Sequence, residues 1–359
     1  MKSVGAKIVG TGELTIEPGC NNFGGRITVS WARWQRAAAF GLCLCPVVTS
    51  CSGVQSTLDP AGKEAESVAT LFWVTTVGGL LIWAVVVAIS QYAARWKRET
   101  ISEKAAGQMI FWGGAVFPVV VLTALLAYAL WLMPFLRPFA SPGEATTRIE
   151  VVGHQFWWHV VYHRADGSIV VSANEIRLPV GERVEFSLTS ADMIHSFWIP
   201  ALGGKMDLIP GRINRLSLLA QRTGTYRGQC AEFCGTSHAL MAFPAVVMEP
   251  VEFEAWLEQR SVSAATDPAN AGQAVFFREK CGECHSVAGT EAKGAAGPDL
   301  SHVGSRLTLG AGRMENNETN MARFIANPSL IKPGSHMPGY QSLSQEDLSV
   351  VAKWLKGLQ

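Results

Sequence analysis

Two long apolar runs stand out in the first half of the chain. Neither Val68–Ser90 nor Met109–Leu136 contains a charged side chain. A helix rises about 1.5 Å per residue, so about 20 apolar residues cross a hydrocarbon core about 30 Å thick. The runs predict two transmembrane helices, and two buried helices of a soluble protein are the alternative. Basic Arg95, Lys97 and Arg98 between them place the loop in the cytoplasm and the outer ends on the periplasmic or outer side of a bacterial cell membrane.

A shorter apolar run, Ala37–Val48, lies nearer the N-terminus and follows two arginines. It is too short to span a bilayer, and a basic segment, a short apolar run and small residues together are typical of an export signal. The cysteine that follows resembles that of a bacterial lipoprotein signal. Residues 1–50 are therefore predicted to be a cleaved leader with Cys51 as a lipid-modified first residue, and an uncleaved membrane segment is the alternative. Residues 51–145 would hold a tether and both helices.

Beyond the second run the pattern changes to alternating apolar and polar positions. Alternation with a period of two is typical of strands that are buried on one face, and Gly, Pro and Asp mark the turns between them. About seven or eight short strands over residues 146–257 predict a β-sandwich. The clearest strands are Arg148–Val152, Ile169–Val171, Arg183–Leu188 and Arg215–Leu218.

Two further segments complete the chain. Residues 258–270 are rich in Ser, Ala, Thr and Pro, which is typical of a linker. Residues 271–359 form a separate domain that ends in a predicted helix, Gln345–Leu358.

Composition agrees with a membrane protein of two or three domains. The chain has 359 residues, of which 48% are hydrophobic and only 16% charged. Its formal net charge of +1 excludes a nucleic-acid-binding function that depends on bulk electrostatics. Of its eight cysteines, two lie in each of two motifs described below and the others precede residue 52. No further cysteines remain in the folded part for a disulfide framework.

The first motif follows the predicted strands. Cys230, Cys234, His238 and Met241 lie within one short segment. Thiolate, imidazole and thioether together are the ligands that copper prefers, and two thiolates on one loop can bridge two copper ions. A second imidazole must then come from elsewhere, and His195 is the candidate. A disulfide and a zinc site are the alternatives, but neither has a use for the thioether.

The second motif is Cys281-Gly-Glu-Cys-His285, the attachment signature of c-type haem. Cys281 and Cys284 would bind the haem covalently, and His285 would be the proximal iron ligand. A redox dithiol or a zinc site is the alternative. The turn Gly297–Leu300 resembles the one that supports the proximal histidine in cytochromes c.

The sixth iron ligand should lie downstream of this motif. Met337 is the preferred residue, because class I cytochromes c place a methionine before a proline in a loop that precedes the final helix. A His/Met pair raises the reduction potential relative to two histidines. His336 is the second choice, and the remaining candidates are Met314, Met321 and His302.

From about Leu58 to Pro250 the chain resembles subunit II of haem–copper cytochrome c oxidases. The fold class implied is a multi-domain membrane protein with a two-helix transmembrane hairpin, an all-β cupredoxin sandwich and an all-α class I cytochrome c domain. The copper loop is the most specific part of the resemblance. The other matching segments are His154–Trp158, Met193–Trp198 and Lys205–Arg212.

The resemblance implies a binuclear copper centre, CuA. Two thiolates would bridge both copper ions, two imidazoles would bind one copper each, and a thioether and a backbone carbonyl would be weak axial ligands. The implied ligands are, in that order, Cys230 and Cys234, His195 and His238, and Met241 and the carbonyl of Glu232.

The resemblance also implies a face that contacts subunit I. The carboxylate of Glu232 would lie where the family binds magnesium between the subunits, and a carboxylate suits that hard cation. Asp207 and Arg212 would lie near the haem propionates of subunit I, and a turn with a surface ion pair is the alternative for them. Near Gln108–Trp112, where the family often has a glutamate at a proton channel, there is no acid. No proton-entry residue is therefore assigned.

An aromatic stretch departs from the family. The first tryptophan of that stretch is where an external cytochrome delivers its electron, and here the position is Phe156, followed by Trp157 and Trp158. These three residues are expected to serve electron transfer or an interface, and simple core packing is the alternative for each.

The expected function is electron delivery from haem c to CuA and on to subunit I, which reduces oxygen to water and pumps protons. Tethering the donor raises its effective concentration. The other expected partners are subunit III, membrane lipid and a donor such as a cytochrome c or an upstream respiratory complex. The alternatives are the input subunit of a nitric or nitrous oxide reductase, and a membrane-anchored electron carrier or copper-delivery protein with no fixed catalytic partner.

Overall fold

The structure, a computed structural model, describes residues 7–9, 13–15, 29–30, 52–95, 101–136, 147–262, 267 and 269–359. Residues 1–51 and 52–359 form two separate units. The described segments of the first unit are β1 (Lys7–Val9), β2 (Glu13–Thr15) and β3 (Val29–Ser30), which form an antiparallel sheet. The rest of the expected leader, with Cys51, lies outside the described residues.

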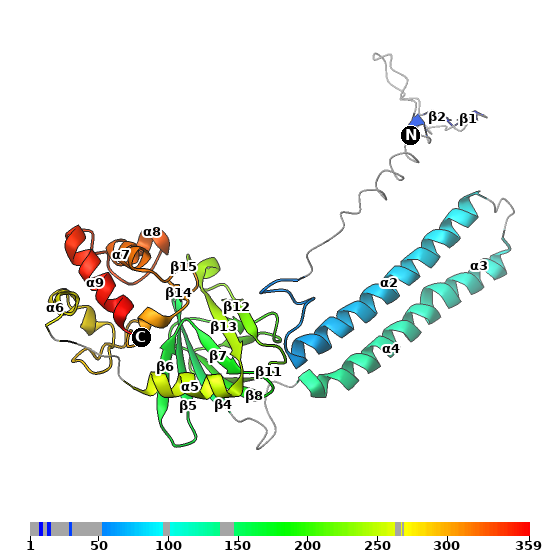
Figure 1. Cartoon of the computed structure of the whole chain (residues 1–359). Coiled ribbons are helices and arrows are strands. Elements are labelled where there is room, and N and C mark those ends of the chain that lie inside the picture. The colour runs from blue at the N-terminus through cyan, green and yellow to red at the C-terminus, as the bar shows by residue number, and fades with distance from the viewer. Residues whose placement is uncertain are drawn as a thin grey trace, which may run out of the picture. The chain divides into compact units, whose positions relative to one another are not determined.

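The two apolar runs form two long helices, as predicted (Figure 1). The first, α2 (Lys63–Arg95), extends beyond the run 68–90 at both ends. The second is continuous from Glu103 to Leu132, six residues earlier than its run, because Ser102 caps its start by accepting a hydrogen bond from the Ala105 amide. Both are long and apolar enough to cross a membrane, and most of their large apolar side chains are exposed. Apolar surface of this extent is suited to a lipid environment.

The second long helix is not uniform. A π-helical segment, η1 (Ile110–Val116), separates α3 (Glu103–Met109) from α4 (Phe117–Leu132), and a short 3₁₀ turn, η2 (Met133–Leu136), follows. Pro118 lies at the start of α4. Proline has no amide hydrogen and clashes with the carbonyl four residues earlier, so it interrupts the α-helical bonding pattern at this point.

A buried ion pair attaches the start of α2 to the sandwich. Glu64 Oε1 lies 2.8 Å from Arg183 Nη1, and Glu64 Oε2 accepts a hydrogen bond from the Leu219 amide at 3.1 Å. Both charged groups are largely shielded from water, so removing either would leave an uncompensated buried charge. The pair therefore fixes where the helix leaves the sandwich.

Residues 147–248 form a sandwich of two five-stranded sheets, which confirms the predicted fold. Its strand count exceeds the predicted seven or eight because several strands are only three or four residues long and carry little alternation. The orders are β10-β9-β12-β13-β7 and β11-β8-β4-β5-β6. The strands are β4 (Thr147–His154), β5 (Trp157–His163), β6 (Ile169–Ala173), β7 (Ile176–Pro179), β8 (Arg183–Ser190), β9 (His195–Trp198), β10 (Met206–Leu208), β11 (Asn214–Leu219), β12 (Gly224–Cys230) and β13 (Ala242–Met248).

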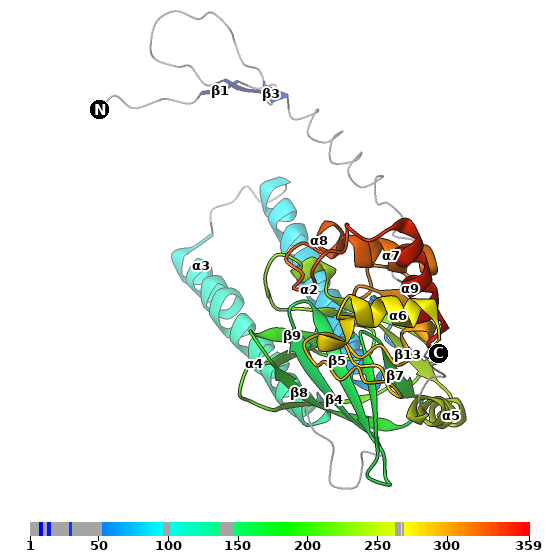
Figure 2. The same cartoon turned by 90° about the vertical axis from the view of Figure 1, so that its left-hand side faces the viewer.

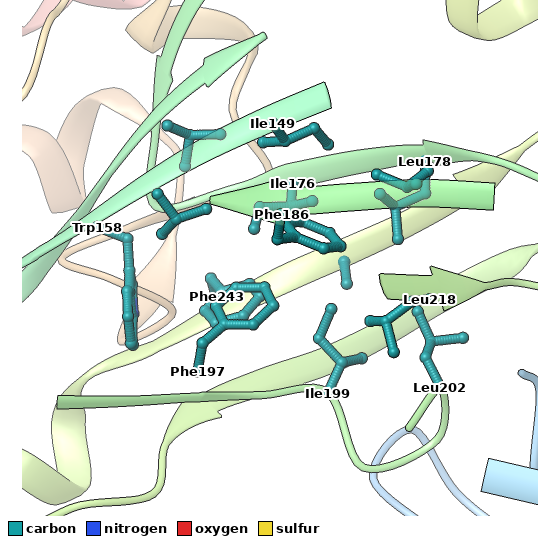
Figure 3. Close-up of a cluster of buried hydrophobic side chains, with 14 of the residues drawn as sticks. Ile149, Trp158, Ile176, Leu178, Phe186, Phe197, Ile199, Leu202, Leu218 and Phe243 are labelled. Carbon is teal, nitrogen blue, oxygen red and sulfur yellow. The ribbon is translucent and has the colours of Figure 1, made fainter. Parts of the chain in front are cut away.

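The core lies between the sheets (Figure 3). Along β8 every second side chain is buried, as the alternation predicted. At the end nearest the copper loop the core is aromatic. Phe197 and Phe243 stack with ring centroids 5.0 Å apart, and Trp158 packs edge-on against both. Such contacts make this end of the sandwich a rigid support for the loops beyond it.

The sandwich continues into a helix, α5 (Pro250–Ser261), which buries Phe253, Trp256 and Leu257. The helix therefore includes residues 258–261, the first residues of the segment 258–270 that was expected to be a linker. Residues 263–266 and 268 of that segment lie outside the described residues.

The C-terminal domain is helical, as expected (Figure 1 and Figure 2). Its first and last helices cross closely, since a Cβ on Gly272 would lie 2.2 Å from the Val350 carbonyl oxygen. Phe276 and Trp354 pack at this crossing with ring centroids 5.1 Å apart. The elements are α6 (Ala271–Arg278), η4 (Cys281–Glu283), η5 (Val303–Ser305), β14 (Thr308–Leu309), β15 (Met314–Glu315), α7 (Glu318–Ala326), α8 (Pro328–Ile331) and α9 (Gln345–Gly357).

Candidate metal centre and haem site

The copper loop joins β12 to β13, and one strand pairing brings the second histidine to it. Cys230 ends β12 and pairs with Phe197 of β9, two residues after His195. His195 is fully buried beside the loop. The structure thus brings together the residues that the sequence predicted from two distant segments.

The thiols and imidazoles lie at metal-ligand spacing. The Sγ atoms of Cys230 and Cys234 are 3.8 Å apart. His195 Nδ1 lies 3.8 Å from Cys230 Sγ, and His238 Nδ1 lies 3.6 Å from Cys234 Sγ. A disulfide would need an S–S distance of about 2.05 Å, and both cysteines are free. Metal–thiolate bonds of about 2.3 Å allow both sulfurs to bind the same ion.

Two weaker donors complete the set. Met241 Sδ lies 3.9 Å from Cys234 Sγ, and the carbonyl oxygen of Glu232 lies 3.2 Å from Cys230 Sγ. Together with the two thiols and the two imidazoles, these make six donor atoms that converge on this loop. A structural zinc ion takes four ligands in a tetrahedron, so the donor set exceeds what one zinc ion uses. It fits two copper ions that share the thiolates.

The electrostatics favour a thiolate at this position. A shared proton with Cys234 lowers the pKa of the Cys230 thiol, and the hydrogen bond from His195 contributes in the same direction against the effect of burial. Burial opposes protonation of His195, but its bonds to Cys230 and Asp192 outweigh that effect and raise its pKa. A bound metal would replace the proton that these groups share.

Asp192, which the sequence pattern did not single out, holds His195 in its orientation. His195 Nε2 donates to Asp192 Oδ1 at 2.8 Å, which leaves Nδ1 directed at the thiol. The amides of Gln155 and Met193 each donate to Asp192 at 2.6 Å. Burial opposes ionisation of Asp192, but these hydrogen bonds outweigh it and lower its pKa. A carboxylate that orients a metal-binding histidine is a common outer partner, and its place three residues before His195 was the available signal.

The aromatic stretch divides into three environments. Trp158 is 0% exposed and packs in the core, which contradicts an interface role and leaves its expected role in electron transfer a prediction. Strand residues alternate between faces, and Trp158 takes the inner face. Trp157 stacks on His154 with ring centroids 4.3 Å apart. Phe156 is 5% exposed, because it packs in the core cluster of the sandwich and its ring also lies close to Gly334 of the C-terminal domain.

The residues expected to face a partner subunit lie on the surface. Lys205 Nζ lies 3.8 Å from a carboxylate oxygen of Asp207 and 3.7 Å from one of Glu232. The lysine therefore brings both acids into one cluster beside the copper loop. Arg212 is exposed in the turn after β10.

The haem-attachment residues line one cavity of about 270 Å³ in the C-terminal domain. Cys281 and Cys284 are free thiols at its wall. His285 Nδ1 donates to the Pro298 carbonyl at 2.8 Å, which leaves Nε2 available for iron. Burial lowers the pKa of His285 and favours the neutral imidazole that binds metal. The turn predicted to support the histidine does so.

The same cavity selects among the sixth-ligand candidates. Met337, Met321 and His336 line it. His302 instead donates through Nε2 to the Arg260 carbonyl at 3.1 Å, and neither it nor Met314 lies at the cavity wall. Met321 is buried in α7 within the hydrophobic core, whereas Met337 lies on the loop before α9.

The haem cavity is not confined to its own domain. Residues of the sandwich also line it, among them Phe156, Trp157 and Asp192. Asp192 is the carboxylate that orients His195, a predicted copper ligand, so the two candidate cofactor sites share a wall. Lys332 also lies at this wall, and burial lowers its pKa to about 7. Nothing in the local sequence marked Lys332 as important.

Comparison with known proteins covers both soluble domains. The family model for the periplasmic domain of cytochrome c oxidase subunit II matches residues 161–251, and the cytochrome c model matches residues 269–359.

Two curated relatives extend over nearly the whole chain. Cytochrome c oxidase subunit 2 of Alkalihalophilus pseudofirmus is 35% identical over 328 residues, 87% of this chain and 94% of the relative. The Bacillus subtilis protein of the same name is 32% identical over 349 residues, 89% of this chain and 96% of the relative. A crystal structure of the periplasmic domain of cytochrome oxidase subunit II of Bradyrhizobium japonicum is 34% identical and covers 33% of this chain and 94% of its own, with a TM-score of 0.31.

Replacing the carboxylate that orients His195 should weaken metal binding. We expect Asp192→Asn to lower copper affinity by about 10- to 100-fold, because the neutral amide no longer fixes the imidazole as strongly. Copper titration of the purified chain, followed by absorbance, measures this. Asp207→Asn is the control, since Asp207 contacts Lys205 and no ligand, and it should leave the affinity unchanged. Equal affinities for Asp192→Asn and the native chain would contradict the assigned role.

Proposed function

The chain belongs to the cytochrome c oxidase subunit II family, and we propose that it passes electrons from a haem c on its C-terminal domain to a CuA centre and on to subunit I. Copper and haem c are the groups that these two domains carry. Membership also implies association with subunit I of a haem–copper oxidase. The two apolar helices fit a membrane protein.

This proposal rests on the cavity wall that the candidate haem site shares with the copper domain. The residues that would hold haem c line a cavity together with Phe156 and Asp192 of the copper domain. On the loop before Met337, the Pro333 carbonyl accepts a hydrogen bond of 2.6 Å from Ser237 Oγ, and Ser237 precedes the copper ligand His238. A direct contact between the two ligand-bearing loops suits electron transfer within one chain.

The copper ligands would be Cys230, Cys234, His195, His238 and Met241, with the carbonyl of Glu232. A binuclear copper centre supplies one-electron transfer. The protein holds the ligands on a loop between two core strands and orients His195 through Asp192, so the ligand set keeps its geometry.

In the haem domain, Cys281 and Cys284 would form the covalent links, and His285 and Met337 would be the axial ligands. Methionine as sixth ligand raises the reduction potential relative to histidine. The hydrogen bond from His285 to Pro298 fixes the ring orientation. A Cβ on Gly297 would lie 2.5 Å from His285 Cε1, so the absence of a side chain there lets the turn approach the imidazole.

Electrons would pass to subunit I through the face that carries Asp207 and Glu232. Two large apolar side chains next to the expected interface residues are strongly exposed: Phe233, which follows Glu232, is 75% exposed, and Ile213, which follows Arg212, is 71% exposed. Exposed apolar groups rimmed by charges are typical of an interface. Glu232 would contribute to a magnesium site at that interface, and Arg212 would contact the haem propionates of subunit I.

The entry point would differ from that of relatives without a fused cytochrome. Phe156 occupies the position of the family's electron-accepting tryptophan; it is buried, and its ring lies close to Gly334 of the chain's own cytochrome domain. An external donor would therefore deliver its electron to the haem domain.

Both soluble domains would lie on the periplasmic or outer side of the bacterial membrane, anchored by two helices and, if residues 1–50 are cleaved, by lipid on Cys51. Subunit III would be a further partner.

The function is tested by following both centres in the purified oxidase complex. After reduction and rapid mixing with oxygen, haem c should be reoxidised through copper, as read from haem c and CuA absorbance. Cys234→Ser removes a bridging ligand and should leave haem c reduced, while Glu252→Gln, an exposed change on α5, should have no effect. Reoxidation of haem c at the native rate in Cys234→Ser would overturn the route.

The same preparation separates the alternative functions. Oxygen consumption without consumption of nitric or nitrous oxide supports the oxidase. Consumption of either nitrogen oxide in its place would support a reductase. Isolation without subunit I, with copper readily lost to a chelator, would support a free electron carrier or a copper-delivery protein.

The sixth ligand is tested by exchange of its donor atom. Met337→His should lower the reduction potential of haem c and change its absorption spectrum, because imidazole replaces the thioether. Met321→Leu is the matched control in the same cavity and should leave both unchanged. A native spectrum and potential for Met337→His, with a shift for Met321→Leu, would reassign the ligand.

Glu232 is expected to have two separate roles, one for its backbone and one for its side chain. Glu232→Gln keeps the carbonyl near Cys230 and removes the charge, so the copper spectrum should stay nearly native while transfer from CuA to subunit I slows. Flash-induced transfer rates and copper spectra of the purified complex measure both. If the change abolished copper binding, the division between carbonyl and carboxylate would be wrong.

A further inference from the structure

Lys332 is a buried lysine at the boundary between the copper domain and the cytochrome domain. It is only 4% exposed and lies at the end of α8, five residues before Met337. In the part of the chain that the structure describes, no carboxylate lies within ion-pair distance of its amine. Burying an amine is costly unless its donors are satisfied, so its hydrogen bonds indicate what holds it there.

Those hydrogen bonds join the two domains. Lys332 Nζ donates to the carbonyl oxygen of Phe156 in the copper domain, and to that of Gly310 in the cytochrome domain at 2.9 Å. An amine has at least two N–H donors whether or not it is protonated. Both acceptors can therefore be satisfied in either state, but only when the two domains are docked.

The residues that follow Lys332 contact the copper loop directly. Pro333 accepts the hydrogen bond from Ser237, next to His238. A Cβ on Gly334 would lie 3.4 Å from the Phe156 ring and 3.5 Å from Thr236, and this glycine has a φ of +77°. The segment therefore approaches the copper domain through backbone and small groups, which keeps the Met337 loop close to the His238 loop.

A backbone contact next to Gly310 completes the junction. The Ala242 amide, which follows the copper ligand Met241, donates to the Ala311 carbonyl at 3.0 Å. Lys332 thus supports a Gly310–Ala311 segment that itself bonds to the copper domain. A second contact between the domains lies close by in the cytochrome domain, where the Leu307 amide donates to Glu175 Oε2 at 2.7 Å.

We propose that Lys332 is a positioning residue that seats the cytochrome domain on the copper domain, so that the loop of Met337 contacts the loop of His238. This rests on the proposed transfer from haem c to CuA and adds what sets its rate. Electron transfer depends steeply on the separation of donor and acceptor. A tether alone raises the donor concentration, whereas Lys332 selects one docked arrangement.

The test uses the oxidase complex loaded with haem c and copper, with Lys332→Met as the variant that keeps length and loses the donors. Transfer from haem c to CuA should slow about tenfold, because transfer within a bound pair depends on how closely the two centres are positioned. Amide hydrogen exchange at Ala242 should be about tenfold faster, as expected for loss of about one net hydrogen bond. Exchange at Gly304, whose amide bonds to the Leu358 carbonyl within the cytochrome domain, and both cofactor spectra should stay native.

Two further variants make the test decisive. Lys353→Met, an exposed change on α9, should match the native complex in every measurement. Lys332→Gln keeps two N–H donors without charge and should recover most of the transfer rate. Native transfer and native Ala242 exchange in Lys332→Met would overturn the proposal, as would slow transfer with unchanged Ala242 exchange. It would also fall if the glutamine variant were as slow as the methionine variant.

Failure of the proposed function gives a different result. If the native complex sends no electrons from haem c to CuA, the assigned electron route is wrong. The exchange rate of the Ala242 amide still reports on docking in that case, because it needs no electron transfer. Faster exchange in Lys332→Met would then support the positioning role of Lys332 on its own.

Discussion

The pairing of β9 with β12 is the constraint on which the copper end of the molecule depends. Cys230 lies opposite Phe197 in this pairing, and that register brings His195 beside the thiols. A slip of one residue would turn every side chain of β9 to the other face. The aromatic core beneath the loop opposes such a slip, because Phe197 packs against Phe243 and Trp158 only in this register. Core packing and ligand geometry are therefore one property of the same strands.

The junction between the soluble domains relies on a second kind of constraint. A buried ionisable side chain of each domain hydrogen-bonds to the backbone of the other: Glu175 accepts from the Leu307 amide, and Lys332 donates to the Phe156 carbonyl. Such groups contribute little net stability, because leaving water costs nearly as much as the bonds return. They do discriminate among docked arrangements, since a shifted interface would leave them unsatisfied. The junction is thus better suited to specifying the relative orientation of the two domains than to stabilising their association.

This junction also changes the interpretation of the aromatic stretch Phe156–Trp158. At the position expected to meet an external donor, the backbone carbonyl of Phe156 bonds to Lys332 and its ring lies close to Gly334. This position is therefore an internal contact between the two domains. Trp157 remains half-buried beside His154, and Trp158 belongs to the core.

The sequence by itself determined whatever depends on local spacing. The loop from Cys230 to Met241 and the motif from Cys281 to His285 place their predicted ligands within one turn or loop, so residue type and distance along the chain suffice to predict them. Apolar runs and alternation identified the helices and the longer strands for the same reason. Only the tertiary structure decided which face Trp158 takes, that Asp192 orients His195, and that Lys332 reaches Phe156 across 176 positions. These depend on strand register and domain docking, which arise from many contacts between distant segments and leave no periodic trace near any one residue.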